Sequence, residues 1–125
     1  MTIKVLAIDD SRTIREMLRF SLTQNGFDVA VAEDGRIGVD SLAEIAPDVV
    51  ITDINMPRLD GFGVISEIRN GEVHPSVPIL VLTTESAAEL KDRARKSGAT
   101  GWIVKPFDDE KLVSAIRRIA SVRRR

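Results

Sequence analysis

Residues 48–61 read DVVITDINMPRLDG. The run Val49-Val50-Ile51-Thr52 has the composition of a strand that is buried on both faces, and Asp53 comes directly after it. The residues that follow, with Asn55-Met56-Pro57 and Asp60-Gly61, are typical of a loop. A carboxylate is therefore expected at the carboxyl end of a buried strand, which is where open parallel sheets bind their ligands.

Three other apolar runs also end in polar residues of a chosen type. The run 5–8 is followed by Asp9 and Asp10, the run 79–82 by Thr83, and the run 102–104 by Lys105. If the strands are parallel, their carboxyl ends share one edge of the sheet, and these side chains should meet there with Asp53.

Apolar runs alternate with segments of helical period, which predicts an α/β fold with a five-stranded parallel sheet, doubly wound with helices on both faces. The expected strands are 3–8, 27–31, 48–53, 79–83 and 101–105. Between the second and third strands, the stripe of Ile37, Leu42 and Ile45 predicts a single helix. The helix 87–97 has only one large apolar residue, Leu90, and is expected to be weakly anchored and mobile.

Length and composition exclude several classes of protein. At 125 residues the chain is expected to form one domain, residues 1–125, without an output domain. The lack of cysteine excludes disulfides and thiolate sites and fits a cytoplasmic location. No apolar stretch is long enough to cross a bilayer, so no membrane partner is expected. The 18 basic side chains balance 19 acidic ones, which argues against nucleic acid as a partner, and Arg123-Arg124-Arg125 is interpreted as a solvated tail.

The polar residues at the strand ends suit phosphoryl transfer. Asp9, Asp10 and Asp53 would repel one another unless a cation lies among them, and a site made of oxygen ligands suits Mg²⁺. Phosphoryl transfer requires mainly in-line positioning and neutralisation of charge. Lys105 can neutralise one phosphoryl oxygen and Thr83 can donate a hydrogen bond to another, which leaves Asp53 as the acceptor.

These residues resemble the receiver domains of two-component response regulators. The resemblance spans the whole chain and is carried by Asp9-Asp10, Asp53 with Asn55-Met56-Pro57 and Asp60-Gly61, Thr83, and Lys105-Pro106-Phe107. The chain is most similar to single-domain chemotaxis receivers of the CheY type, because Asn55 lies two residues after the acceptor and Glu85 two residues after Thr83. The resemblance implies a flavodoxin-like (βα)5 fold with strand order 2-1-3-4-5, the order known for CheY.

The resemblance also implies a metal site. Asp10 and Asp53 would bind Mg²⁺, or Mn²⁺ in its place, through their carboxylates. Asn55 would add its backbone carbonyl, and Asp9 would act through a water.

A switch is implied as well. Lys105 and Thr83 would hold phosphorylated Asp53, with a cis peptide bond between Lys105 and Pro106. Inward movement of Thr83 would let the aromatic residue of the fifth strand, Trp102, change position. Asn55 and Glu85 would tune the lifetime of the phosphorylated state.

By this resemblance, the chain accepts a phosphoryl group from a histidine kinase or a phosphotransfer domain and then binds a separate target, such as the flagellar motor switch. It would catalyse its own phosphorylation and autodephosphorylation without being a conventional enzyme. The expected target surface is formed by the helix 87–97, the strand 101–105 and the last helix. Basic residues gather on these two helices: Lys91, Arg93, Arg95, Lys96, Lys111, Arg117 and Arg118.

Other functions compete with this interpretation. A phosphorelay intermediate or a phosphate sink would use the same chemistry without a regulated target. A phosphatase of the haloacid dehalogenase type needs an acid two residues after its nucleophile, where this chain has Asn55. A flavodoxin-like FMN binder needs a phosphate loop after the first strand, where Asp9-Asp10 would repel the phosphate.

Overall fold

The computed structural model describes the backbone of residues 2–123 and the side chains of residues 2–120, so the side chains of the terminal arginines lie outside it. Five strands form the sheet: β1 (Lys4–Ile8), β2 (Asp28–Ala32), β3 (Val49–Thr52), β4 (Ile79–Thr83) and β5 (Gly101–Val104). The helices are α1 (Arg12–Gln24), α2 (Gly35–Asp40), α3 (Leu42–Ile45), α4 (Gly61–Asn70), α5 (Ala88–Ser97) and α6 (Asp109–Arg123). None of the described helices is both long and apolar enough to cross a membrane.

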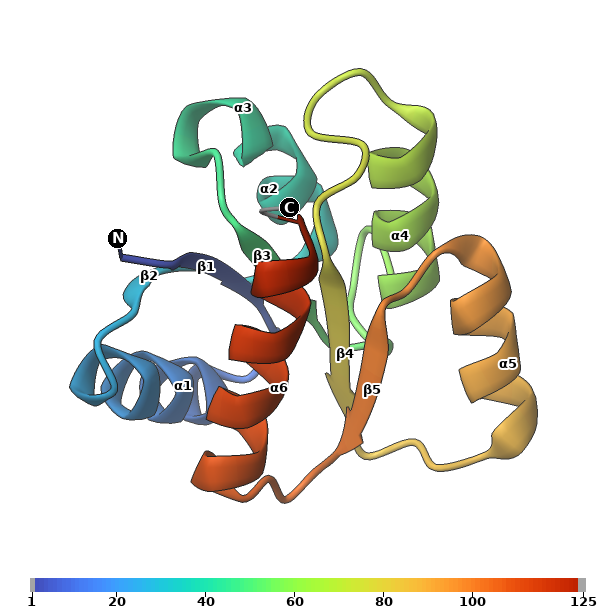
Figure 1. Ribbon diagram of the computed structural model, residues 1–125. Helices are drawn as coiled ribbons and strands as arrows, with labels where there is room; N and C mark the ends of the chain where they lie inside the picture. Colours follow the sequence, from blue (N-terminus) through green and yellow to red (C-terminus); the bar gives the residue numbers. More distant parts are fainter. Residues whose placement is uncertain (1, 124–125) are drawn as a thin grey trace.

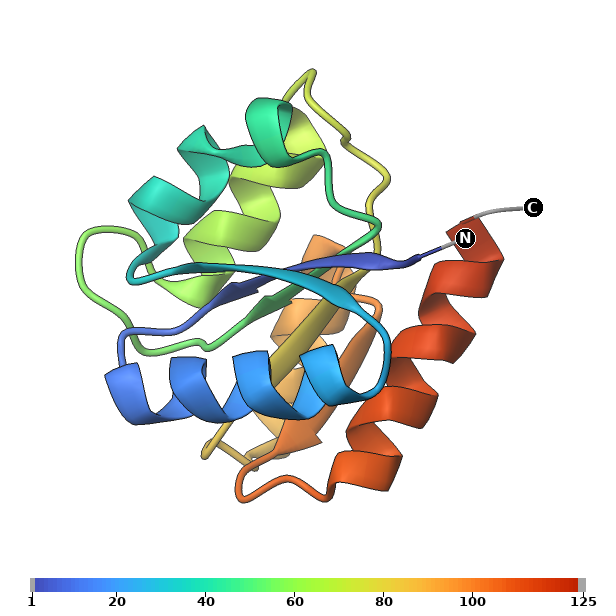
Figure 2. The ribbon, with the colours of Figure 1, turned by 90° about the vertical axis from the view of Figure 1, so that its left-hand side faces the viewer.

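All neighbouring strands are parallel, and their order is β2-β1-β3-β4-β5, which confirms the predicted fold class and strand order (Figure 1). α1 and α6 cover one face of the sheet, and α2 to α5 cover the other (Figures 1 and 2). Ile51 packs into the core on the first face, and its neighbour Val50 packs into the core on the second. Because successive strand residues face opposite sides, a strand covered on both faces is apolar throughout.

The chain between β2 and β3 forms two short helices, so the prediction of a single helix was wrong. They separate at Ser41, whose N–H and hydroxyl both bond to the Gly38 carbonyl in the last turn of α2 (3.3 and 2.9 Å). Of the predicted apolar stripe, Leu42 is buried but Ile37 is 37% exposed. α2 packs instead through Gly38, where a Cβ would lie 2.4 Å from the Ile8 side chain. A pattern of large apolar residues does not reveal a helix that packs through glycine.

α5 has few apolar contacts, as expected. Ala94 is its only buried residue, and no side chain caps its first turn within the described part of the chain. Two arginines anchor it to α4: Arg93 lies 3.8 Å from the centre of the Phe62 ring, and Arg69 donates to the Gly98 carbonyl (3.0 Å). α5 is therefore held largely by its neighbouring helix. Its mobility stays a prediction.

Gly61 begins α4 at a point where the backbone leaves no room for a side chain. Its N–H donates to the Ile54 carbonyl (2.8 Å), and a Cβ would lie 2.2 Å from the Asp53 carbonyl oxygen. Replacing Gly61 by Ala should lower the free energy of unfolding by about 1–3 kcal/mol, because the backbone itself must move. Urea unfolding would measure the change.

Gly63→Ala is the matched control. The added methyl group there meets side-chain atoms of Leu59 and Asp60 and no backbone, and alanine favours a helix over glycine by about 1 kcal/mol. Equal unfolding midpoints for the two variants would contradict the assigned role of Gly61.

Candidate functional site

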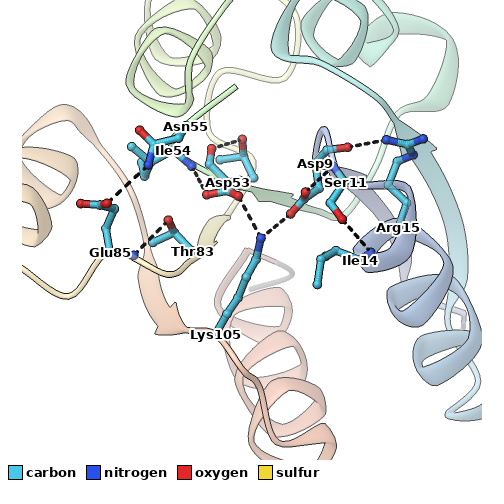
Figure 3. Close-up of polar contacts among 11 residues, drawn as sticks. Asp9, Ser11, Ile14, Arg15, Asp53, Ile54, Asn55, Thr83, Glu85 and Lys105 are labelled. Atoms are coloured by element: carbon cyan, nitrogen blue, oxygen red, sulfur yellow. Dashed lines mark hydrogen bonds and ion pairs between the residues drawn. The ribbon is translucent and has the colours of Figure 1, made fainter. Parts of the chain in front are cut away.

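Three strand ends place one ammonium group between two carboxylates. Asp9 follows β1, Asp53 follows β3 and Lys105 follows β5. The Lys105 Nζ lies 2.8 Å from Asp9 Oδ2 and 2.9 Å from Asp53 Oδ2 (Figure 3). All three side chains are at most 11% exposed, so water screens this interaction poorly. The peptide bond between Lys105 and Pro106 is cis, as predicted.

Asp9 is fixed by the start of α1. Its Oδ1 accepts the Ser11 N–H (2.9 Å), and the Ser11 hydroxyl in turn accepts the Ile14 N–H (3.3 Å) as the N-cap of the helix. Arg15 donates from Nη1 to the Asp9 carbonyl (2.9 Å). The carboxylate is left with Oδ2 directed to Lys105 (Figure 3).

Asp53 is positioned by backbone groups on both sides. Its N–H donates to the Ile8 carbonyl (3.1 Å) beyond the end of β3, and the Thr52 hydroxyl donates to its carbonyl (2.8 Å). Its Oδ1 accepts the Ile54 N–H (2.6 Å), while Oδ2 accepts from Lys105. The carboxylate therefore has one fixed orientation at the end of the strand.

The electrostatics of the site favour one positive charge next to two carboxyl groups. Burial raises the pKa of the Asp9 carboxyl above its ordinary value, and the hydrogen bonds from Lys105 and Ser11 offset this only in part. Burial alone would lower the pKa of Lys105, but its hydrogen bonds to Asp53 and Asp9 outweigh that effect and raise it. Lys105 therefore stays charged at neutral pH.

The donor set fits the predicted metal ion. Asp9, Asp10 and Asp53 each have a carboxylate oxygen within 4.8 Å of the others. Such hard oxygen ligands suit Mg²⁺ or Mn²⁺. Asp10 is exposed, unlike the other two carboxylates, so a cation there could keep several of its waters. Lys105 contacts two of the three groups, and a cation would share those carboxylates with it.

The residues predicted to form the switch meet around Glu85, between β4 and α5. The Glu85 N–H donates to the Thr83 hydroxyl (3.3 Å), and the Glu85 carboxylate accepts from Asn55 Nδ2 (3.4 Å) (Figure 3). The Glu85 carbonyl accepts from the Trp102 indole N–H (3.1 Å). Thr83 is fully buried and Trp102 is half-buried. Glu85 therefore contacts three predicted site residues through three different groups.

The predicted site residues thus fall into two groups. The first, around Lys105, contains Asp9, Asp10 and Asp53; the second, around Glu85, contains Asn55, Thr83 and Trp102. Among the described residues, no hydrogen bond joins Thr83 to Asp53.

Sequence reasoning missed Arg15 and the Ile54 amide as partners of the two central carboxylates. Ser11 could have been found, since a serine directly before a helical pattern is a common N-cap. Arg15 has no such signal, because α1 carries three arginines and only their placement in space separates them.

Asp9→Asn should stabilise the metal-free protein at neutral pH. Since the folded state raises the pKa of Asp9, it binds this proton more tightly than the unfolded chain does. The stability that depends on this group therefore falls as the pH rises above the ordinary value of 3.8. Urea unfolding in EDTA should show a gain for the variant at pH 7 that shrinks as the pH falls.

Asp10→Asn, at an exposed position of the same cluster, is the control and should change less. A gain for Asp9→Asn that stays the same at every pH would contradict the argument from burial.

Comparison with known proteins places this site in a family. The pattern of the response regulator receiver domain matches residues 5–117. The response regulator MprA of Mycolicibacterium vanbaalenii is 39% identical over 119 residues, which are 95% of this chain and 51% of that protein. MprA of Mycobacterium tuberculosis is 37% identical with the same coverage. The chain thus spans about half the length of these curated relatives.

Solved structures agree with the sequence comparison. The chemotaxis protein CheY4 of Vibrio cholerae superposes with a TM-score of 0.90 at 40% identity, over 95% of this chain and 99% of that one. The receiver domain of the sensor histidine kinase PA1611 of Pseudomonas aeruginosa, which has a magnesium ion in its active site cleft, gives a TM-score of 0.88 at 25% identity, over 97% and 99% of the chains. The chain therefore belongs to the response regulator receiver domain family, the family that its strand-end residues resembled.

Proposed function

We propose that this chain accepts a phosphoryl group on Asp53 from a histidine kinase or a phosphotransfer domain, in a Mg²⁺-dependent reaction, and thereby changes its affinity for a separate target. The observation that carries the proposal is the Lys105 ammonium in contact with both Asp9 and Asp53. A cation held against a buried carboxylate can neutralise the charge that a phosphoryl group brings there.

In the proposed transfer, an oxygen of the Asp53 carboxylate attacks phosphorus while the N–P bond to the donor histidine breaks. The histidine leaves as neutral imidazole if its second ring nitrogen already carries a proton. Lys105, which now donates to Asp53, would donate a hydrogen bond to one oxygen of the phosphoryl group. The Thr83 hydroxyl accepts its hydrogen bond from Glu85 and so keeps its own hydrogen to donate to another oxygen.

The metal ligands are proposed as the resemblance implies them. Asp10 and Asp53 would bind Mg²⁺ or Mn²⁺ directly, Asn55 through its backbone carbonyl, and Asp9 through a water. The bound ion would supply charge neutralisation at a phosphoryl oxygen. The three carboxylate oxygens within 4.8 Å of one another support this assignment.

The phosphorylated state is proposed to hydrolyse by itself, so the chain would catalyse its own phosphorylation and dephosphorylation without being a conventional enzyme. The contact between the Asn55 amide and the Glu85 carboxylate lies beside Asp53 (Figure 3). These two polar side chains can order or exclude an attacking water, so we assign them the tuning of the lifetime. The Asn55 amide is not an acid that can protonate a leaving group, which favours this function over a haloacid dehalogenase-type phosphatase.

The target surface is proposed on α5, β5 and α6. A groove of about 410 Å³ between α5 and β5 is lined by Trp102, Ala94 and Lys91, among others. Movement of Trp102 would change the shape of this groove directly. We infer a partner that presents apolar and acidic groups, and the 40% identity to a chemotaxis protein supports a target in the flagellar motor switch.

The basic surface on α5 and α6 is smaller than the sequence predicts. Asp92 pairs with Arg95 (2.6 Å) and Lys96 (2.9 Å). Arg93 stacks on α4, and Arg117 turns to the end of α1. Lys91 at the groove is therefore the better position at which to probe the charge of the partner.

Two further parts of the proposal stay predictions. The chain is proposed to act as a single receiver domain, residues 1–125, in the cytoplasm. This chain covers 99% of the Vibrio cholerae chemotaxis chain and 51% of the MprA relative.

Acetyl phosphate with Mg²⁺ should label the wild-type protein on Asp53, and mass spectrometry should find no label on Asp53→Asn. Lys105→Ala should slow labelling about 100-fold, the scale expected for losing one charge-stabilising group. EDTA should stop labelling, and Mn²⁺ should restore it. Arg36→Ala, on the exposed surface between α2 and α4, is the control and should react like the wild type. Labelling of Asp53→Asn at the wild-type rate would exclude Asp53 as the acceptor.

Beryllofluoride, a phosphoryl mimic, should tighten binding to the target by about 5- to 150-fold, the usual range of coupling between two sites. Lys91→Glu should weaken that binding and leave the labelling of Asp53 unchanged. Arg19→Glu, on exposed α1, is the control. If only Arg19→Glu lost binding, the target would bind the face that carries α1, and the proposed surface on α5, β5 and α6 would be wrong. If beryllofluoride left the affinity for the target unchanged, the result would favour a phosphorelay intermediate or a phosphate sink.

A further inference from the structure

The loop between β3 and α4 is attached to the start of α2 by two contacts, and Figure 2 shows the two segments side by side. A Cβ on Gly35 would lie 2.1 Å from the Leu59 carbonyl oxygen, so the first residue of α2 packs directly against the loop backbone. One residue earlier, Asp34 Oδ2 lies 3.5 Å from Arg58 Nε. The loop is therefore held from outside as well as at its ends.

Arg58 has a backbone conformation that side-chain-bearing residues rarely adopt. Its φ is 67°, and the Leu59 N–H donates to the Pro57 carbonyl (2.8 Å) to close a tight turn around it. A non-glycine residue in this region costs about 1–3 kcal/mol and persists only where its surroundings hold it there. Glycine would fit this turn without strain, so the arginine points to a use for its side chain.

Asp34 is suited to hold that side chain. Its Oδ1 accepts the Ile37 N–H (2.8 Å) and caps α2, which leaves Oδ2 for Arg58. The Asp34 side chain is 5% exposed and the Arg58 side chain 66%. A carboxylate fixed in a helix cap is a rigid anchor, whereas an exposed guanidinium would otherwise sample many rotamers.

We propose that Asp34 and Arg58 form a clamp that positions the β3–α4 loop, and with it the Asn55 backbone carbonyl, for metal binding. Both are positioning residues, because neither touches Asp53 or its cluster in the described contacts. The clamp rests on the proposed function, which makes the Asn55 carbonyl a ligand. Asn55 lies three residues before Arg58 in the same short loop.

The test is a titration of the full chain with Mg²⁺. Binding is measured by calorimetry and by the fluorescence emission of Trp102, the only tryptophan. Asp34→Asn keeps an oxygen for the helix cap. Arg58→Gly keeps the left-handed turn and relieves its strain, so both variants remove the ion pair while preserving the local backbone conformation. The Kd for Mg²⁺ should rise about tenfold in both variants, the lower end of the effect of groups that orient metal ligands.

The two variants together separate positioning from charge. If charge alone mattered, losing the negative Asp34 would weaken Mg²⁺ binding and losing the positive Arg58 would strengthen it. The clamp requires weaker binding in both, and a double variant no weaker than either single one. Asp60→Asn is the matched control, since Asp60 caps α4 by accepting the Gly63 N–H (2.8 Å), and it should bind Mg²⁺ like the wild type.

Urea unfolding in EDTA supplies a second measurement. A purely structural role would lower the metal-free midpoint and leave the Kd for Mg²⁺ unchanged, and that result would overturn the clamp, as would opposite signs in the two variants. If the wild type binds Mg²⁺ and is labelled on Asp53 while both variants bind equally well, the clamp alone is wrong. If the wild type binds no Mg²⁺, the clamp and the proposed function both fall.

Discussion

The contact of one ammonium group with two carboxylates holds this site together. β1 and β3 are neighbours in the sheet, so the short side chains of Asp9 and Asp53 reach a common point. β5 is separated from β3 by β4, a distance of about 10 Å across two strand spacings, and only a long side chain can cross it. The order of the strands therefore requires a long side chain on β5, and Lys105 supplies it.

The same arrangement leaves the negative charge of the site incompletely balanced. Asp9 is buried more completely than its hydrogen bonds compensate, and one lysine serves two acids. Like charges that are incompletely balanced respond strongly to any added charge, whether a cation or a phosphoryl group. The apolar strand residues, which are buried on both faces of the sheet, stabilise the fold against this cost at the strand ends.

The sequence predicted the parallel sheet and the cluster of acids with Lys105, because buried parallel strands and strand-end residues are local patterns with one common geometric consequence. The strand order came only from the resemblance to receiver domains. It did not predict the break at Ser41 or packing through Gly38, since a small residue in close contact leaves no apolar signal. The contacts of Arg15 and Arg58 were also missed. Their partners depend on how distant segments meet in space, and periodicity carries no information about that.

Glu85 takes part through its N–H and carbonyl as well as through its carboxylate. The first two groups belong to the backbone, which every residue except proline would offer equally. Substitution at this position therefore changes only the contact with Asn55 and leaves those with Thr83 and Trp102 in place. Under the proposed function, the lifetime of the phosphorylated state can therefore change with the residue at position 85 while the backbone contacts to Thr83 and Trp102 stay in place.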